Sequence, residues 1–135
     1  MKYILNLFLF SLLTLSVTSC EKDEGKKPDI RFKTGTTYTS SDATVTSGTL
    51  VTIGILAEKT EEEDVLKHFN VSLSVDGLPS TSLEDIELTG TDGDVYDVDY
   101  TFTVPPTPGH SYKLTFTVTN RDGLTNQVAL TLTAN

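Results

Sequence analysis

This chain of 135 residues contains no tryptophan, two histidines and a single cysteine, Cys20. One cysteine cannot form a disulfide within the chain, so the fold must be stable through packing alone. Without tryptophan, few aromatic side chains remain on which a sugar could stack. Lys and Arg number 10 against 19 Asp and Glu, a formal net charge of −9, which disfavours binding to the phosphates of nucleic acids.

The chain also lacks an apolar run long enough to span a bilayer. Its most apolar stretch, Tyr3–Leu15, is short and interrupted by polar residues, whereas a spanning helix needs about 20 mainly apolar residues. Lys2 precedes this stretch, and the small residues Thr18 and Ser19 follow it. A charged start, a short apolar core and small residues at the end predict that residues 1–19 are a signal peptide.

The end of this segment, Val17-Thr18-Ser19-Cys20, resembles a bacterial lipobox, in which an aliphatic and two small residues precede a cysteine. The resemblance implies that Cys20 receives a diacylglycerol, that the chain is cut before it, and that the new N-terminus is acylated, for example with palmitate. Several acyl chains anchor stably, since each buried methylene contributes about 0.8 kcal/mol. The alternatives are an ordinary secretory signal with a coincidental cysteine, or an uncleaved anchor.

The next residues, Glu21-Lys22-Asp23-Glu24, resemble the acidic surface-export signal of Bacteroidetes-type lipoproteins. That resemblance implies a lipid-anchored protein of the outer membrane that faces the cell exterior. A solvated linker is the alternative, because such charges prevent folding. We predict that residues 20–27 are the lipidated cysteine and a polar tether, which when extended lifts the domain on the order of 25 Å from the membrane.

Residues 28–135 form one predicted domain, in which apolar and polar residues alternate with the period of half-buried strands. The clearest predicted strands are Asp29–Lys33, Leu50–Ala57, Phe69–Val75, Val95–Val104, Tyr112–Val118 and Val128–Ala134. Weaker strands are expected within Thr34–Ser47 and at Leu83–Leu88, and the acidic run Glu58–Asp64 is expected to be a loop. The alternation predicts that Val51, Ile53, Ile55, Ala57, Tyr112, Leu114, Phe116 and Val118 face inward and that Gly54 and Ser74 face outward. Seven or eight short strands without a useful helix predict an all-β antiparallel sandwich.

The closing stretch, residues 108–123, resembles the F–G hairpin of immunoglobulin-like and PKD-like domains. Tyr112 lies where those domains place a tyrosine corner, and Leu114 takes the place of the second immunoglobulin cysteine. Ile53 or a neighbour would replace the first cysteine, and Phe69 or Val71 would fill the place of the core tryptophan. The resemblance implies an immunoglobulin-like sandwich that is not of the antibody type.

Four aspartates lie within eight residues, and two of them are candidate calcium ligands. Asp92 and Asp94 fall in a predicted loop, and calcium prefers oxygen ligands from a loop that curls around the ion. Asp97 and Asp99 are predicted to project from the face of a strand. The alternative is a solvated acidic face, or a strand edge that its charges protect from pairing.

Tyr38 is the candidate glycan-binding residue, because most other aromatic residues after Cys20 fall on core-facing positions of predicted strands. Catalysis has little support. A Ser-His-Asp set needs converging side chains, and we expect His68 and His110 at opposite ends of the sandwich. The acidic residues of Leu83–Leu88 would suit a glycosidase in principle, but a small sandwich offers no evident deep cleft.

The sequence therefore predicts a non-catalytic outer-membrane surface lipoprotein that acts as a binding or assembly module, with no catalytic residue. The family resemblance implies an accessory place in glycan capture. The alternative is a structural or adhesive subunit that adds a strand to a protein partner, through the edge at Asp29–Lys33 or Leu83–Leu88; a hydrolase ranks third. No cofactor is expected beyond the covalent lipid on Cys20, and calcium at Asp92 and Asp94 is kept as the less favoured alternative to a solvated acidic face. The expected partners are the membrane, a glycan or a protein, but no nucleic acid.

Overall fold

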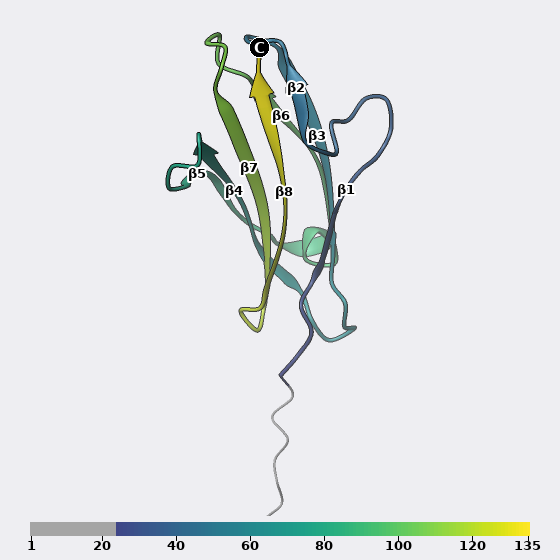
Figure 1. Cartoon of the computed structure of the whole chain (residues 1–135). Helices are drawn as coiled ribbons and strands as arrows, with labels where there is room; N and C mark the ends of the chain where they lie inside the picture. The colour runs from purple at the N-terminus through teal and green to yellow at the C-terminus, as the bar shows by residue number, and fades with distance from the viewer. Residues whose placement is uncertain (1–23) are drawn as a thin grey trace, which may run out of the picture.

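The computed structural model describes residues 24–135 and shows an immunoglobulin-like β-sandwich of eight strands (Figure 1). The strands are β1 Asp29–Phe32, β2 Ala43–Val45, β3 Leu50–Glu58, β4 Leu66–Val75, β5 Thr81–Glu87, β6 Val95–Thr103, β7 Ser111–Asn120 and β8 Thr125–Ala134. One short 3₁₀ helix, η1 Gly90–Gly93, precedes β6. The predicted signal peptide and Cys20 lie outside the described residues, within which no helix is long and apolar enough to cross a membrane.

The strands form two sheets that pack face to face. The smaller sheet has the order β1-β3-β6, and the larger has the order β2-β8-β7-β4-β5. All neighbouring strands are antiparallel except β2 and β8, which are parallel. This arrangement confirms the all-β sandwich predicted from the alternating sequence.

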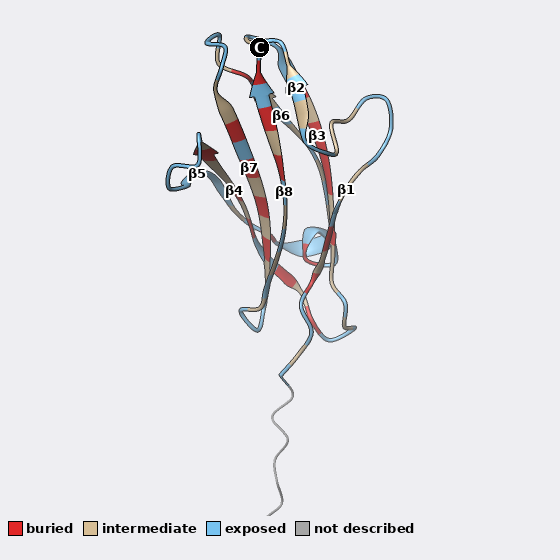
Figure 2. Cartoon of the chain, in the orientation of Figure 1, coloured by how far each residue is buried: buried red, intermediate tan, exposed pale blue. Residues whose placement is uncertain are grey.

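The core lies where the predicted inward faces of the central strands meet (Figure 2). On β3 the buried side chains are those predicted, Val51, Ile53, Ile55 and Ala57. On β7 the buried apolar side chains are Tyr112, Leu114, Phe116 and Val118, again as predicted. Two facing strands with alternate residues inward place one apolar layer against another, which is the arrangement that stabilises a sandwich.

Aromatic rings occupy the centre that a disulfide and a tryptophan fill in antibody domains. Phe116 is fully buried, and its ring centroid lies 6.2 Å from Phe32, 6.2 Å from Phe69 and 5.5 Å from Tyr100. These rings come from both sheets. Burial of one such side chain contributes about 1.5–3 kcal/mol, so this cluster supplies the cohesion that no disulfide provides.

One long side of the sandwich is closed by the N-terminal part of the chain, which switches sheets. β1 pairs with β3 of the smaller sheet, and β2 pairs with β8 of the larger. The backbone bonds Ser47 N–H to Asn135 C=O (3.0 Å) and Asn135 N–H to Val45 C=O (3.0 Å) continue the second pairing. We call this side, formed by β1, β2 and β8, the closed flank.

The opposite side is formed by β5 and β6, and only the η1 segment crosses between the sheets there. The core-facing side chains of β6 are partly exposed along its whole length, namely Tyr96, Val98, Tyr100 and Phe102. Ile86 on β5 is also only half-buried. We call this side the open flank.

Two details differ from the sequence predictions. Gly54 was predicted to face outward into solvent but is buried, because the side chains of Lys33 and Tyr38 lie over it. Ser74 was also predicted outward and is buried, with its hydroxyl donating to the carbonyl of Leu78. Both positions lie under connecting segments whose course the alternation of a single strand does not reveal.

Candidate functional site

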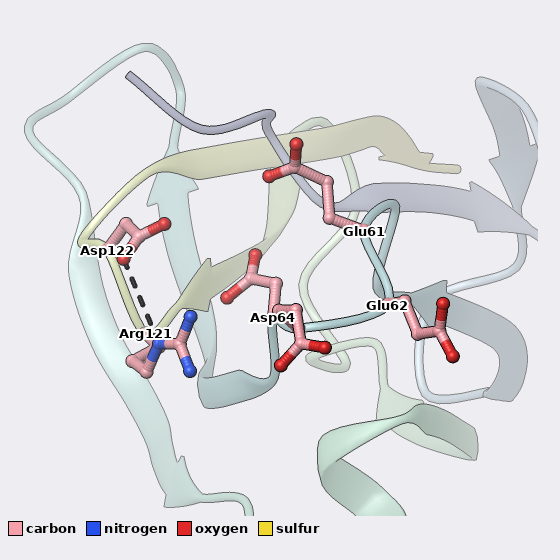
Figure 3. A pocket seen from close by; sticks show the side chains of 6 residues that line it. Glu61, Glu62, Asp64, Arg121 and Asp122 are labelled. Atoms are coloured by element: carbon pink, nitrogen blue, oxygen red, sulfur yellow. Dashed lines mark ion pairs between the residues drawn. The ribbon is translucent and has the colours of Figure 1, made fainter. Parts of the chain in front are cut away.

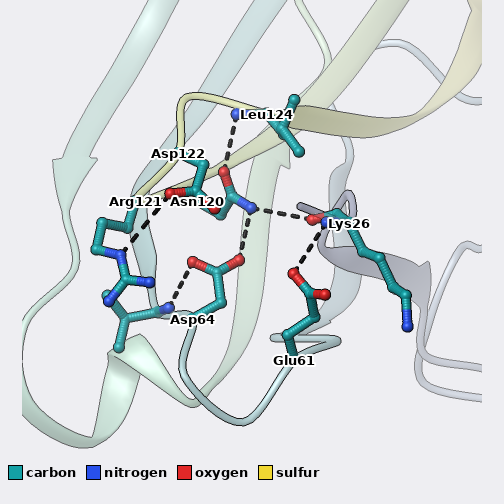
Figure 4. A network of polar contacts seen from close by, with 8 residues as sticks. Lys26, Glu61, Asp64, Asn120, Arg121, Asp122 and Leu124 are labelled. Carbon is teal, nitrogen blue, oxygen red and sulfur yellow. Dashed lines mark hydrogen bonds and ion pairs between the residues drawn. The ribbon is translucent and has the colours of Figure 1, made fainter. Parts of the chain in front are cut away.

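The most developed polar arrangement holds the N-terminal segment, residues 25–28, against one end of the sandwich (Figure 4). At its centre, the side-chain amide of Asn120 donates to Asp64 Oδ2 at 2.6 Å and to the carbonyl of Lys26 at 3.0 Å. Asn120 Oδ1 accepts from the backbone N–H of Leu124 at 2.8 Å, inside the β7–β8 turn. One side chain therefore joins the N-terminal segment, the β3–β4 loop and the β7–β8 turn.

Asp64 and Asn120 are each 2% exposed. A carboxylate at that depth is costly unless its oxygens are hydrogen-bonded. Asp64 meets this requirement, because its Oδ1 accepts from the N–H of Val65 at 2.8 Å and its Oδ2 accepts from Asn120. The pair is thus a satisfied buried unit, and loss of the Asn120 amide would leave Asp64 Oδ2 without its hydrogen-bond donor.

Three further contacts fasten the same segment. Glu61 Oε2 accepts from the N–H of Lys26 at 3.0 Å, the hydroxyl of Thr60 donates to the carbonyl of Lys27 at 2.9 Å, and the amide of Asn126 donates to the carbonyl of Pro28 at 2.9 Å. Together with Asp64 and Asn120, these residues form what we call the docking network.

The docking network changes the predicted tether. Residues 25–27 were expected to be part of a free linker, but they are bound to the sandwich. Residues 21–24, the part between Cys20 and the docked segment, span at most about 14 Å when extended. The acidic run that follows Glu58 forms a loop and residues 120–123 form a hairpin turn, as the sequence predicts. Neither segment carries a sequence signal for the buried Asp64–Asn120 pair.

A small pocket of about 190 Å³ adjoins the docking network (Figure 3). Its lining residues are Glu61, Glu62, Glu63, Asp64, Arg121 and Asp122. Five of the six are acidic, and Arg121 Nε lies 3.9 Å from Asp122 Oδ1. Across residues 24–135, no group of three or more His, Cys, Asp or Glu side chains is arranged to hold a metal ion.

The two candidate calcium ligands lie around η1. Asp92 is part of this short 3₁₀ helix, where the sequence predicted a loop, and Asp94 follows the helix directly. The carboxylate of Asp94 pairs with Lys59, with Oδ1 2.7 Å from Nζ. A cation from the protein itself therefore already lies beside one of the two predicted ligands.

Tyr38, the candidate glycan-binding residue, lies half-buried over the outer face of the smaller sheet. Its ring centroid is 5.1 Å from Lys33 Nζ, and its hydroxyl donates to Asp99 Oδ2 at 3.3 Å. The Lys33 ammonium pairs with both Asp97 and Asp99, which project outward from β6 as predicted. Hydrogen bonds from Lys33 and then Tyr38 lower the pKa of Asp99, so this carboxylate stays charged.

The two histidines lie at opposite ends of β4, as predicted. His68 lies near the start of β4, while His110 Nδ1 is 2.6 Å from Oδ2 of Asp76, the residue that follows the end of β4. The intervening strand separates the two by about 26 Å. Asp76 also accepts from the N–H of Ser111 at 2.8 Å, and this bond, followed by that from His110, lowers the pKa of Asp76.

Comparisons with known proteins show the fold alone. No protein-family model matches the sequence, and a search of the curated proteins finds no match. Superoxide reductase (neelaredoxin) from Ignicoccus hospitalis is similar in structure, with a TM-score of 0.54 and 10% identity over 82% of this chain and 81% of that chain. A variant of that enzyme gives a TM-score of 0.56 and 11% identity over 87% and 86%.

A third structure, the sporulation control protein Spo0M from Bacillus subtilis, has a TM-score of 0.48 and 14% identity, over 81% of this chain and 49% of that one. Sequence identities this low show a shared fold and carry no information about a shared activity.

Proposed function

We propose that this chain is a non-catalytic lipoprotein of the outer membrane, anchored through lipid on Cys20 and exposed at the cell exterior, where its sandwich serves as a binding or assembly module. Two sequence features support the proposed location: the lipobox-like residues before Cys20 and the acidic stretch that resembles a Bacteroidetes-type export signal. An accessory role in glycan capture follows from the same resemblance.

The docking network is the structural observation that supports this proposal. It fastens residues 25–28 to the end of the sandwich that carries the β3–β4 loop and the β7–β8 turn. A lipid on Cys20, which four residues separate from Gly25, would hold that end close to the membrane. The β2–β3 and β6–β7 loops meet Asn135 and Ala134 at the other end through backbone hydrogen bonds, and would point away from the membrane.

The arrangement of reactive side chains also supports binding over catalysis. His110 and Asp76 pair with each other, Lys33 pairs with Asp97 and Asp99, and Asp94 pairs with Lys59. These sets lie on separate parts of the sandwich, whereas acid–base or nucleophilic catalysis needs several groups around one substrate.

The anchor is tested by expressing the full chain and Cys20→Ser in the same bacterium with radiolabelled palmitate. The proposal predicts label on the wild-type chain only, with the wild type in the outer-membrane fraction and the variant released from it. Protease added to intact cells should digest the wild-type sandwich. An unlabelled wild type, or a variant that keeps its label, would overturn the anchor; full protection from protease would overturn the outward orientation.

Glycan binding is tested separately at Tyr38, by retention of the full chain during electrophoresis through gels that contain a polysaccharide. Tyr38→Ala should abolish retention, while Tyr38→Phe, which keeps the ring, should preserve most of it. Equal retention of the wild type and Tyr38→Ala on every polysaccharide that retards the wild type would exclude Tyr38 as the platform.

A further inference from the structure

The outer edge of β6 is a strand edge whose backbone groups have no partner within residues 24–135. Lys33 N–H donates to Gly54 C=O and Thr39 N–H to Thr52 C=O, so these residues of β3 direct their backbone groups toward β1 and the segment that follows it. By antiparallel alternation, Ile53 and Ile55 bond to Tyr100 and Val98 of β6. The backbone groups of the intervening β6 residues therefore point to the free side, namely those of Asp97, Asp99, Thr101 and Thr103.

This edge differs from the three other free edges of the two sheets. β1 has four residues and β2 has three, so each offers little to pair with. β5 is interrupted by a register shift opposite Val71 and Ser72. β6 pairs with β3 over nine residues without a shift. Short strands and bulges are devices that discourage further pairing, and β6 has neither. Its edge charges, Asp97 and Asp99, repel acidic segments but attract basic ones.

The side chains beneath this edge are incompletely covered. Tyr96, Val98, Tyr100 and Phe102 face the core from β6 but stay partly exposed, while Ile53 and Ile55 beside them on β3 are 0% exposed. An added strand would cover this apolar row with its own inward side chains, as strand addition does in other sheets.

The surroundings of the edge are acidic. Burial is the main cause that raises the pKa of Tyr96 and Tyr100; the negative charges of Asp92 and then Glu84 raise that of Tyr96 further, and the charge of Glu84 raises that of Tyr100. On the outer face, one Lys33 ammonium lies between Asp97 and Asp99, so one negative charge there is unbalanced. Opposite charges on neighbouring strands attract and like charges repel.

We propose that the outer edge of β6 receives an extended segment of a partner protein in which apolar side chains alternate with lysine or arginine. The apolar side chains cover the row from Tyr96 to Phe102, and the basic ones lie beside Asp97 and Asp99. A second copy of this chain fits less well, because each copy carries a formal net charge of −9. This inference deepens the proposed function, on which it rests, by naming the binding surface and the chemistry of its partner.

The test uses the full chain in detergent and a fluorescent, end-capped heptapeptide of alternating valine and lysine, titrated by anisotropy. Thr101→Pro removes a free-edge N–H that β3 does not use, and should weaken binding at least tenfold; Thr101→Ala keeps the N–H and should bind like the wild type. A valine–glutamate heptapeptide should not bind. Equal binding of both heptapeptides, or of the proline and alanine variants, would overturn the proposal.

If circular dichroism shows that Thr101→Pro does not fold, the wild-type chain still decides. Two modified peptides are compared, one N-methylated at every lysine and the other at every valine, so that each lacks the backbone N–H donors along one edge of the peptide strand. Strand addition uses one edge of the peptide, and therefore predicts that only one of the two peptides binds. Equal binding of both peptides would overturn the proposal. Because palmitate labelling of Cys20 does not involve β6, a labelled chain that fails to bind refutes this inference and leaves the anchor intact.

Discussion

The two long sides of this sandwich are built from strands with the same alternating pattern, but the chain closes one side and leaves the other open. On the closed flank the chain passes from β1 in one sheet to β2 in the other, and inward residues such as Leu130 and Leu132 on β8 are at most 1% exposed. On the open flank β5 and β6 belong to different sheets and stay apart, and the inward row of β6 is partly exposed.

The difference teaches that closure of a sandwich depends on the course of the chain as much as on strand composition. β6 is as regularly patterned as β7, yet β7 lies between two strands and β6 has a neighbour on one side only. The closed flank therefore contributes more to the stability of the fold, and the open flank keeps an unpaired strand edge with which another chain could pair.

The largest expected effect is the loss of the core ring that joins the sheets. Phe116→Ala should lower the free energy of unfolding by about 3–5 kcal/mol, because Phe116 is fully buried. Phe102→Ala, on the partly exposed row of the open flank, should cost about 1–2 kcal/mol, since less area returns to water. Urea unfolding of the full chain measures both, and equal losses would contradict the view that the row on the open flank is less completely buried than the centre of the core.

The next effect concerns the docking network at the end of the sandwich. Asn120→Ala leaves the buried Asp64 carboxylate without its amide partner and should cost about 2–3 kcal/mol. It should also speed tryptic cleavage after Lys26, whose backbone carbonyl Asn120 holds. The neighbouring Arg121→Ala is the matched control, because that side chain is 53% exposed and should change stability by less than about 0.5 kcal/mol. Unchanged proteolysis in the Asn120 variant would show that other contacts hold the segment.

A smaller effect is expected where the β1–β2 connection crosses the sheet. A Cβ atom on Gly54 would lie 2.8 Å from Lys33 Cβ and 2.9 Å from Tyr38 Cδ1, so Gly54→Ala must displace the segment that closes the flank. We expect a loss of about 1–3 kcal/mol by thermal melting. Thr52→Ala on the same outer face is the control and should be near neutral. A neutral Gly54→Ala would mean that the connection shifts without cost.

The smallest expected effect is on acid stability. The pKa of Asp76 is lowered by the N–H of Ser111 and by His110, so its folded form favours the carboxylate. The resulting stabilisation is present above the ordinary value of 3.8 and is lost as pH falls through the lowered folded value. Asp76→Asn, which tolerates the positive φ of 52° there, should flatten the decline of melting temperature below about pH 4. An unchanged acid slope would exclude Asp76 as its source.

The fold was largely predictable because alternation reports which residues of a strand face inward. Val51, Ile53, Leu114 and Phe116 were all placed in the core from sequence and are buried. The site was less predictable, because its contacts join distant segments. Nothing around Asn120 indicates that its amide reaches both Asp64 and Lys26, which lie 56 and 94 residues away.

The positions of the strand edges were also only partly predictable from the sequence. The segments at Asp29–Lys33 and Leu83–Leu88 were correctly predicted as edges, and β1 and β5 occupy the ends of their sheets. β6 was predicted as one of the best strands, and such strands are usually central. Its edge position follows from the sheet order β1-β3-β6, which the pattern of β6 itself does not encode.

Amide hydrogen exchange of the full chain, read residue by residue, tests the contrast between the flanks most directly. On the closed flank the N–H of Thr131 donates to Asp42 Oδ1 at 2.7 Å, whereas on the open flank the N–H of Thr101 has no partner among the described residues. We predict slow exchange at Thr131 and fast exchange at Thr101, with slow exchange at the flanking Tyr100 and Phe102. Equal protection of Thr101 and Thr131 would contradict an open β6 edge.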